Sequence, residues 1–244
     1  FCVAFSACFC CAGSLLAEDN NPHTDKMMNE KLNLTQEWDK VFPKSDKVTH
    51  RKVSFRNRYG IMLAADLYMP RNVNEKLPAI AVSGPFGAVK EQSAGLYAQT
   101  MAERGFLTIA FDPSYTGESG GFPRYVASPD INTEDFCAAV DYLSTRDDVD
   151  SERIGIIGIC GWGGMAVNAA AIDTRIKATA AMTMYDMTRV TAHGYFDAED
   201  SEQARFEKRK ALNAQRTEDY KNGSNALVGG VVDPLPEDAP QFLA

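Results

Sequence analysis

A single cysteine surrounded by glycines is the feature of this sequence best suited to covalent chemistry. Cys160 stands in the run GICGWGG at residues 158–164, between an apolar stretch and one rich in glycine and alanine. Such a run is typical of a sharp strand-to-helix turn that holds a nucleophile in a strained conformation. A thiol there lies at a helix N-terminus, where the helix dipole stabilises negative charge. The alternative, an inert buried thiol, fits Cys137 better, because no glycines flank it.

A cysteine nucleophile also needs a proton acceptor and a donor for the developing oxyanion. The backbone N–H of Gly161, directly after the cysteine, is predicted to face the oxyanion. A histidine base and an orienting carboxylate are harder to find. His23 lies in the N-terminal region, His50 precedes a predicted hairpin, and His193 follows the last predicted strand. Asp186, at the end of that strand, is kept as an alternative acid.

The elements that must position Cys160 follow from the hydrophobic pattern. A hairpin is followed by apolar strands that alternate with helices, which indicates a mostly parallel, doubly wound α/β sheet. A loosely amphipathic lead-in helix is predicted at 26–42, ended by Pro43. The predicted strands are 53–55, 61–69, 79–82, 106–111, 154–157 and 176–184, and the other predicted helices are 96–104, 133–143, 163–172 and 198–213.

Residues 52–189 resemble the dienelactone-hydrolase-like branch of the α/β-hydrolases, whose nucleophile turn carries cysteine in place of serine. The hairpin at 53–69, the turn SGPFG at 83–87, the loop DPSYTGES at 112–119 and the RIG at 153–155 fall in that family's order. The resemblance implies cleavage of ester, lactone or thioester bonds through an acyl-Cys160 intermediate, without a cofactor. It also implies a second oxyanion donor in the 83–87 turn. Pro85 has no N–H, so Phe86 is the candidate.

Two features depart from the family pattern. Trp162 is large where the family prefers a small residue, and it either walls the acyl pocket or is accommodated by the glycines that follow it. The family places the catalytic acid and histidine after the cap, on strands not found before Ala244. We therefore expect a truncated core, and divide the chain into a partial signal peptide (1–17), a lead-in segment (18–50), the hydrolase core (51–186) and a cap-like segment (187–244).

Charge and cysteine placement limit the classes of partner that we expect for this chain. The formal net charge is -8 and no Lys/Arg-rich run is present, so binding along nucleic-acid phosphates is excluded as a main function. A small-molecule acyl substrate is the expected partner, and the oligomeric state is left open. Four of the six cysteines crowd the first eleven residues, which excludes a disulfide scaffold. The other two lack the spacing of metal ligands, so no metal is expected.

The apolar stretch at 1–16 is too short to span a bilayer and resembles a signal-peptide hydrophobic region. Export to the periplasm or the medium is therefore expected, with a lipid anchor at Cys8 or Cys11 as a variant. Two other functions stay open beside hydrolysis. One is acyl transfer to another nucleophile, and the other is a non-catalytic binding or scaffold protein on the same fold.

Overall fold

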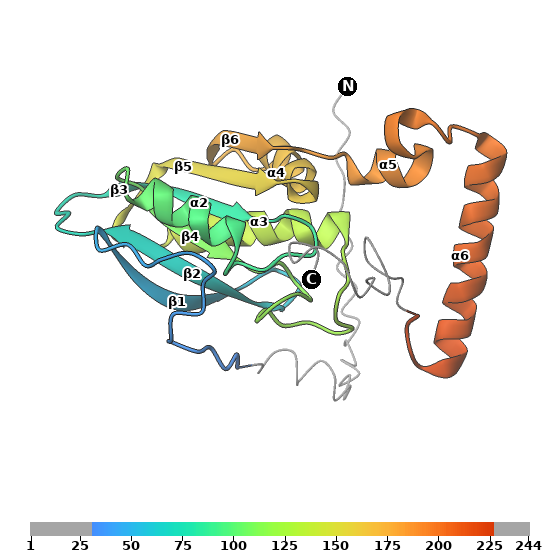
Figure 1. Ribbon diagram of the computed structural model, residues 1–244, viewed down its shortest axis with the longest axis horizontal. Coiled ribbons are helices and arrows are strands. Elements are labelled where there is room, and N and C mark those ends of the chain that lie inside the picture. The colour runs from blue at the N-terminus through green and yellow to red at the C-terminus, as the bar shows by residue number, and fades with distance from the viewer. Residues whose placement is uncertain (1–30, 227–244) are drawn as a thin grey trace, which may run out of the picture.

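The computed structural model describes residues 31–226, and its centre is a six-stranded sheet (Figure 1). The strand order is β1-β2-β4-β3-β5-β6. β1 and β2 form an antiparallel hairpin, β2 pairs antiparallel with β4, and the remaining pairs are parallel. The strands are β1 Val48–Arg56, β2 Met62–Pro70, β3 Leu77–Ser83, β4 Leu107–Phe111, β5 Val149–Ile159 and β6 Ile176–Met182.

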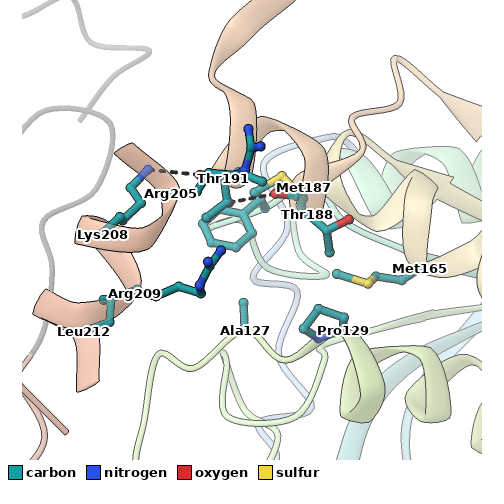
Figure 2. A pocket seen from close by; sticks show the side chains of 12 residues that line it. Ala127, Pro129, Met165, Met187, Thr188, Thr191, Arg205, Lys208, Arg209 and Leu212 are labelled. Atoms are coloured by element: carbon teal, nitrogen blue, oxygen red, sulfur yellow. Dashed lines mark hydrogen bonds between the residues drawn. The ribbon is translucent and has the colours of Figure 1, made fainter. Parts of the chain in front are cut away.

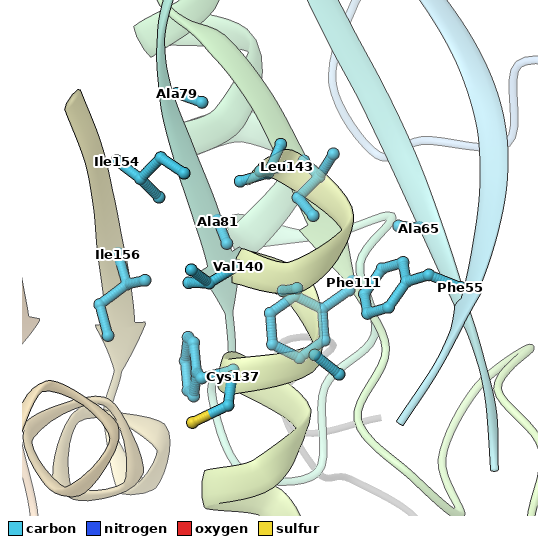
Figure 3. Close-up of a cluster of buried hydrophobic side chains, with 14 of the residues drawn as sticks. Phe55, Ala65, Ala79, Ala81, Phe111, Cys137, Val140, Leu143, Ile154 and Ile156 are labelled. Atoms are coloured by element: carbon cyan, nitrogen blue, oxygen red, sulfur yellow. The ribbon is translucent and has the colours of Figure 1, made fainter. Parts of the chain in front are cut away.

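Helices cover both faces of this sheet, which confirms the predicted doubly wound α/β fold. α2 (Ser93–Ala102) packs on one face through small buried residues, while α3 (Pro129–Ser144) and α4 (Gly161–Ile172) pack on the other. β3 and β4 lie in the middle and are almost entirely buried, which explains their short, continuous apolar runs. Figure 3 shows the larger core, where α3 lies over the inner strands.

The lead-in segment is where the predicted secondary structure is wrong. Residues 31–47 contain no helix, although Trp38 and Phe42 have the spacing of a helical face. Trp38 instead donates from Nε1 to the carbonyl of Phe42 over 2.9 Å, and Phe42 is buried against Gly95 of α2. The segment therefore crosses the sheet as irregular chain, because its two aromatic rings gain more from this packing than from helix formation. The predicted helical residues before 31 lie outside the described residues.

The cap-like segment begins after β6. α5 (Met187–His193) and a short 3-10 turn (Tyr195–Asp197) lead to α6 (Glu202–Asn222), a longer and later helix than the predicted 198–213. Ser201 caps the start of α6, and Gly223 in the left-handed region ends it. Within residues 31–226 no helix combines the length and apolar composition that a bilayer crossing requires. The predicted signal peptide at 1–17 lies outside the described residues.

A chain of buried ion pairs joins the hairpin to the loops at the end of the sheet. The side chains of Lys40, Lys52 and Lys90 are fully buried. Lys90 Nζ lies 2.8 Å from Asp112 and 2.6 Å from Glu118, and Lys52 Nζ also lies 2.6 Å from Glu118. Burial alone would lower the pKa of Lys90, but its three carboxylate neighbours outweigh burial and raise that pKa. Lys52 and Lys90 are therefore structural cations that hold the 84–92 loop against the loop after β4, whereas Lys40 pairs with Asp39 and Asp66.

Removing one member of a buried pair leaves the others uncompensated. We expect Lys90→Met to lower the free energy of unfolding by about 3 kcal/mol or more, because Asp112 would stay buried without its cation. Urea unfolding of the two proteins measures this loss. Lys76→Met, at an exposed lysine, is the matched control and should change stability by about 0.5 kcal/mol or less. Equal losses in both variants would contradict a structural role for Lys90.

Acid should break the ion pairs of the same cluster, because it protonates their carboxylates. Burial raises the pKa of Asp39, but hydrogen bonds and charge from Lys40 and Lys52 outweigh it and lower the pKa to about 2. The pKa of Glu118 is lowered in the same way, by Lys52 and Lys90 against the effect of burial. A carboxyl whose pKa is lowered on folding stabilises the fold above its unfolded pKa, and this contribution is lost as pH falls through the folded pKa.

We therefore expect stability to fall between about pH 4 and pH 2, and Asp39→Asn to flatten that fall. Thermal unfolding followed by circular dichroism across this window measures the slope. Asp46→Asn, at an exposed aspartate in the same segment, should keep the original slope. An unchanged slope in Asp39→Asn would show that other carboxyl groups control acid unfolding.

Candidate active site

Cys160 lies at the turn where β5 ends and α4 begins. Its backbone has φ 58° and ψ -124°, which is unfavourable for a residue with a side chain. Three hydrogen bonds hold it there. The Cys160 N–H donates to the carbonyl of Met182 over 2.8 Å, and the Cys160 carbonyl accepts from the N–H groups of Gly163 at 2.9 Å and Tyr185 at 3.2 Å. β6 and the segment after it therefore fix both backbone groups of the cysteine.

Glycine is required on both sides of this turn because the backbones approach so closely. A Cβ at Gly158 would collide with the carbonyl of Trp162 and lie 2.7 Å from the Cβ of Ala166. A Cβ at Gly84, whose φ is 98°, would collide with the carbonyl of Ile159. The turn after β3 and the turn after β5 thus pack directly on each other. The glycine pattern around residue 160 predicts the tight turn after β5 but not its contact with the turn after β3.

The structure brings the two predicted oxyanion donors together beside Cys160. Gly161 is the first residue of α4, so its N–H has no acceptor one turn earlier in the helix. A Cβ built on Gly161 would lie 3.4 Å from the Cβ of Phe86, so the 83–87 turn lies against the start of α4. The Phe86 N–H donates to no acceptor within the described residues. Both groups are thus available to an external acceptor.

Trp162 does not line either cavity beside the turn. The residue is 3% exposed, belongs to the main core cluster, and its ring packs at a tilt against that of Phe86, with 5.7 Å between ring centroids. Its Nε1 is buried without a hydrogen-bond partner in the part of the chain that the structure describes. Of the two alternatives for this large residue, accommodation under the turn therefore holds, and Trp162 supports Phe86 from below.

Two cavities adjoin the turn. The larger, of about 510 Å³, lies between Phe86, the start of α3 and the helices α5 and α6 (Figure 2). The smaller, of about 220 Å³, includes Gly161 and Asp186. The two share Pro129, Met165, Met187 and Thr188 in their walls, so they form adjoining space beside the start of α4, although Cys160 itself lines neither cavity. An apolar acyl chain of moderate size fits this lining.

The described histidines are held in other interactions. His50 lies on β1, where its Nε2 is 2.7 Å from Oδ1 of Asp66 and its ring packs on Tyr68. β1 is four strand positions from β5, a separation of about 19 Å at about 4.8 Å per strand. His193, at the end of α5, is 2.8 Å from Asp200 through Nδ1. Neither is arranged as a base for Cys160, and His23 lies outside the described residues.

Asp186 is engaged as the N-cap of α5. It accepts hydrogen bonds from the N–H groups of Thr188 at 3.1 Å and Arg189 at 2.9 Å, and from the Thr188 hydroxyl at 2.6 Å. The Thr188 hydroxyl is the largest influence, and together these bonds lower the pKa of Asp186. The geometry thus gives Asp186 a capping role, although it also borders the smaller cavity.

The second cysteine of the folded body provides a contrast. Cys137 lies on α3 inside the core, near Val140 and Ile156 (Figure 3), and burial raises the pKa of its thiol to about 11. Cys160 is only half-buried. The two thiols therefore differ in access, as the glycine pattern around Cys160 indicates.

Three carboxylates are close enough to share a cation. Ligand oxygens of Asp39, Glu91 and Glu118 lie within 4.8 Å of one another. Lys52 contacts all three, and Lys90 contacts both glutamates. Lys40 also pairs with Asp39, so three ammonium groups supply the positive charge of this cluster, and its donor set does not suggest an additional metal.

Sequence reasoning missed the walls of the larger cavity. Met165 and Met187 carry no motif, and Pro129 and Ala127 look like ordinary loop residues. Arg205, Lys208 and Arg209 also line this cavity. Their spacing of three and four residues was a readable signal, because it places all three cations on one face of a helix.

Comparison with known proteins gives several matches. The family model described as X-Pro dipeptidyl-peptidase (S15 family) matches residues 59–231, more than half of the chain. An uncharacterized protein from Pseudomonas aeruginosa is 66% identical over 199 residues, which are 81% of this chain and 53% of that protein. An uncharacterized Escherichia coli protein is 42% identical over 196 residues, 78% of this chain and 63% of that protein. The chain thus spans between half and two thirds of these relatives.

A thiohydrolase of Aspergillus aculeatus is 32% identical over 133 residues, covering 54% of this chain and 41% of that protein. Among solved structures, a hypothetical protein from Pseudomonas aeruginosa superposes with a TM-score of 0.81 at 62% identity, over 88% of this chain and 67% of that one. An α/β hydrolase from Penicillium superposes with a TM-score of 0.57 at 21% identity, over 76% and 60%. The predicted α/β-hydrolase fold is confirmed, and the chain belongs to the X-Pro dipeptidyl-peptidase (S15) family.

Proposed function

We propose that this chain carries the core of an acyl hydrolase that cleaves ester, lactone or thioester bonds through an acyl-Cys160 intermediate. The observation that carries the proposal is the strained backbone of Cys160, which costs on the order of 1–3 kcal/mol and is held by three hydrogen bonds. A turn needed only for packing would not require this strain. The adjoining Gly161 and Phe86 N–H groups and the apolar cavities supply the other parts of an acyl-transfer site.

The reaction proceeds in two steps. The Cys160 sulfur attacks the carbonyl carbon, a carbon–sulfur bond forms, and the carbonyl oxygen becomes an oxyanion that accepts hydrogen bonds from Gly161 and Phe86. Collapse of this intermediate expels the alcohol or thiol, which takes up a proton. Water then attacks the acyl-enzyme, releases the carboxylic acid and returns the cysteine thiol. We place the histidine that moves these protons outside residues 31–226, because His50 and His193 are held elsewhere.

The names of relatives favour thioesters among these substrates. Several curated relatives at about 27–32% identity are named thiohydrolases, and one at 30% identity is named an acyltransferase. The family name instead denotes release of dipeptides from a peptide N-terminus, which requires a site for an ammonium group. The larger cavity has three cations and no acid in its lining, and Asp186 in the smaller one is occupied as a helix cap. This charge supports acyl substrates over peptides.

Acyl transfer to an alcohol or amine uses the same first step. The two reactions differ in whether water or another nucleophile reaches the acyl-enzyme, which depends on water exclusion by the cap. Product analysis in the presence of added alcohols or amines separates them. A non-catalytic scaffold remains the alternative of another class, and it is at odds with the strain at Cys160.

We expect Cys160→Ala in the full-length protein to lower kcat for a short-chain acyl thioester by about a thousandfold or more, because the nucleophile is removed. The rate is measured as release of free thiol from the substrate. A thiol-reactive dye quantifies this thiol in samples from which the protein, whose own cysteines would react, has been removed. Cys137→Ala is the matched control and should retain activity, because Cys137 lies in the core away from the turn. Equal activity of Cys160→Ala and the unmodified protein would refute the proposal.

The two thiols should also differ in alkylation. At pH 8 iodoacetamide should modify Cys160 at least about tenfold faster than Cys137, whose thiol is buried and has a pKa of about 11. Peptide mapping by mass spectrometry follows each site separately, so the N-terminal cysteines do not interfere. In urea the two rates should converge. Equal, slow modification of both thiols in the folded protein would favour the scaffold.

A further inference from the structure

One face of α6 is directed toward the larger cavity. Arg205, Lys208, Arg209 and Leu212 all line it, and their spacing of three, four and seven residues puts them on a single helical stripe. The opposite wall is apolar and includes Phe86, which adjoins Gly161. The cavity therefore has an apolar side near the cysteine turn and a cationic side on the cap helix.

The charge of this lining is opposite to that of the chain. The protein has a formal net charge of -8, yet the larger cavity is lined by three cations and by no aspartate or glutamate. Such a concentration of one sign focuses the potential inside a concave site and favours anions there. An uncharged acyl chain can pack on the apolar wall but would gain nothing from the three charges.

Two of the three cations already have partners. Arg205 forms an ion pair with Asp200 and contacts Nδ1 of His193 at 3.2 Å. Lys208 donates from Nζ to the carbonyl of Thr191 over 2.9 Å, which ties α6 to α5. Arg209 has no hydrogen-bond or ion-pair partner within residues 31–226, and Figure 2 shows it extending from α6 into the cavity. Arg209 is thus the cation available to a ligand.

We propose that Arg209 binds an anionic group of the substrate, so that the enzyme acts on acyl compounds that carry a negative charge. The proposal rests on the function proposed above, because it places the acyl chain between Cys160 and α6. A guanidinium offers two parallel donors that match a carboxylate or a phosphate. The anion belongs either to the far end of the acyl chain, as in a dicarboxylic half-thioester, or to the phosphates of a coenzyme A leaving group.

The test compares matched thioesters with the full-length protein. Glutaryl and pentanoyl thioesters of N-acetylcysteamine differ in a terminal carboxylate. Pentanoyl-coenzyme A and pentanoyl-N-acetylcysteamine differ in the nucleotide portion of the leaving group, which carries its phosphates. We expect one charged member of these pairs to have a kcat/KM about tenfold above its neutral partner, the effect of one charge-assisted hydrogen bond. Arg209→Gln should remove that ratio, and Arg209→Lys should restore part of it.

Lys210→Gln is the matched control, since Lys210 is the next residue of α6, pairs with Glu207 at 3.9 Å and does not line the cavity. It should leave both ratios unchanged. A protein that does not distinguish charged from neutral thioesters, or an Arg209→Gln variant that keeps the preference, would overturn the proposal.

Binding separates this inference from the proposed reaction. Calorimetric titration of the Cys160→Ala variant with the same thioesters reports affinity without turnover. Tighter binding of a charged thioester that is lost in Cys160→Ala/Arg209→Gln supports the anion site, even if the unmodified protein hydrolyses none of them. Charge-dependent binding without any hydrolysis would refute the proposed reaction but not the anion site. Equal binding of charged and neutral thioesters would refute the anion site but not the proposed reaction.

Discussion

The packing of two strand exits against each other is the constraint on which the site depends. Gly158 at the end of β5 touches the backbone of α4, and Gly84 after β3 touches the carbonyl of Ile159, so neither position has room for a side chain. This contact brings the Phe86 N–H beside the start of α4 and leaves Cys160 with a positive φ. The strain persists because β6 accepts from the N–H of the cysteine, while Tyr185 after β6 and Gly163 of α4 donate to its carbonyl.

The buried lysines extend that constraint outward. Lys90 holds the loop that contains Phe86, because its backbone N–H donates to Asp112 over 2.8 Å and its ammonium group to the same carboxylate over 2.8 Å. Asp112 directly follows β4, the strand beside β3. Burial raises the pKa of Asp112, which opposes the charge it must carry, so the pair is maintained only by its full set of hydrogen bonds. The loop that contains Phe86 is therefore fixed against the loop after β4.

The fold was predictable where the hydrophobicity of the residues agrees with their burial in the structure. The inner strands are apolar throughout, and the glycines of the 158–164 run mark the turn, so both could be predicted without coordinates. β1 was predicted too short because its buried His50 and Lys52 look like surface residues. Buried lysines are rare, and their partners come from segments up to 66 residues away, so local patterns contain no information on them. The irregular conformation of the lead-in segment could not be predicted for the same reason, because Phe42 packs against α2, which is distant in sequence.

The division between the cysteine turn and the cap bears on why proteins similar to this chain carry the names of different reactions. Cleavage of a peptide, an ester or a thioester all begins with attack on a carbonyl and stabilisation of an oxyanion, which need only residues close to the two strand exits. Under the proposed function, the substrates are distinguished by the group at the other end of the cavity, where the wall is formed by α5 and α6. Within residues 31–226 α6 has no buried residue and contributes nothing to the two hydrophobic clusters. Under the proposed function, a substitution on α6 would therefore change substrate preference without disturbing the cysteine turn.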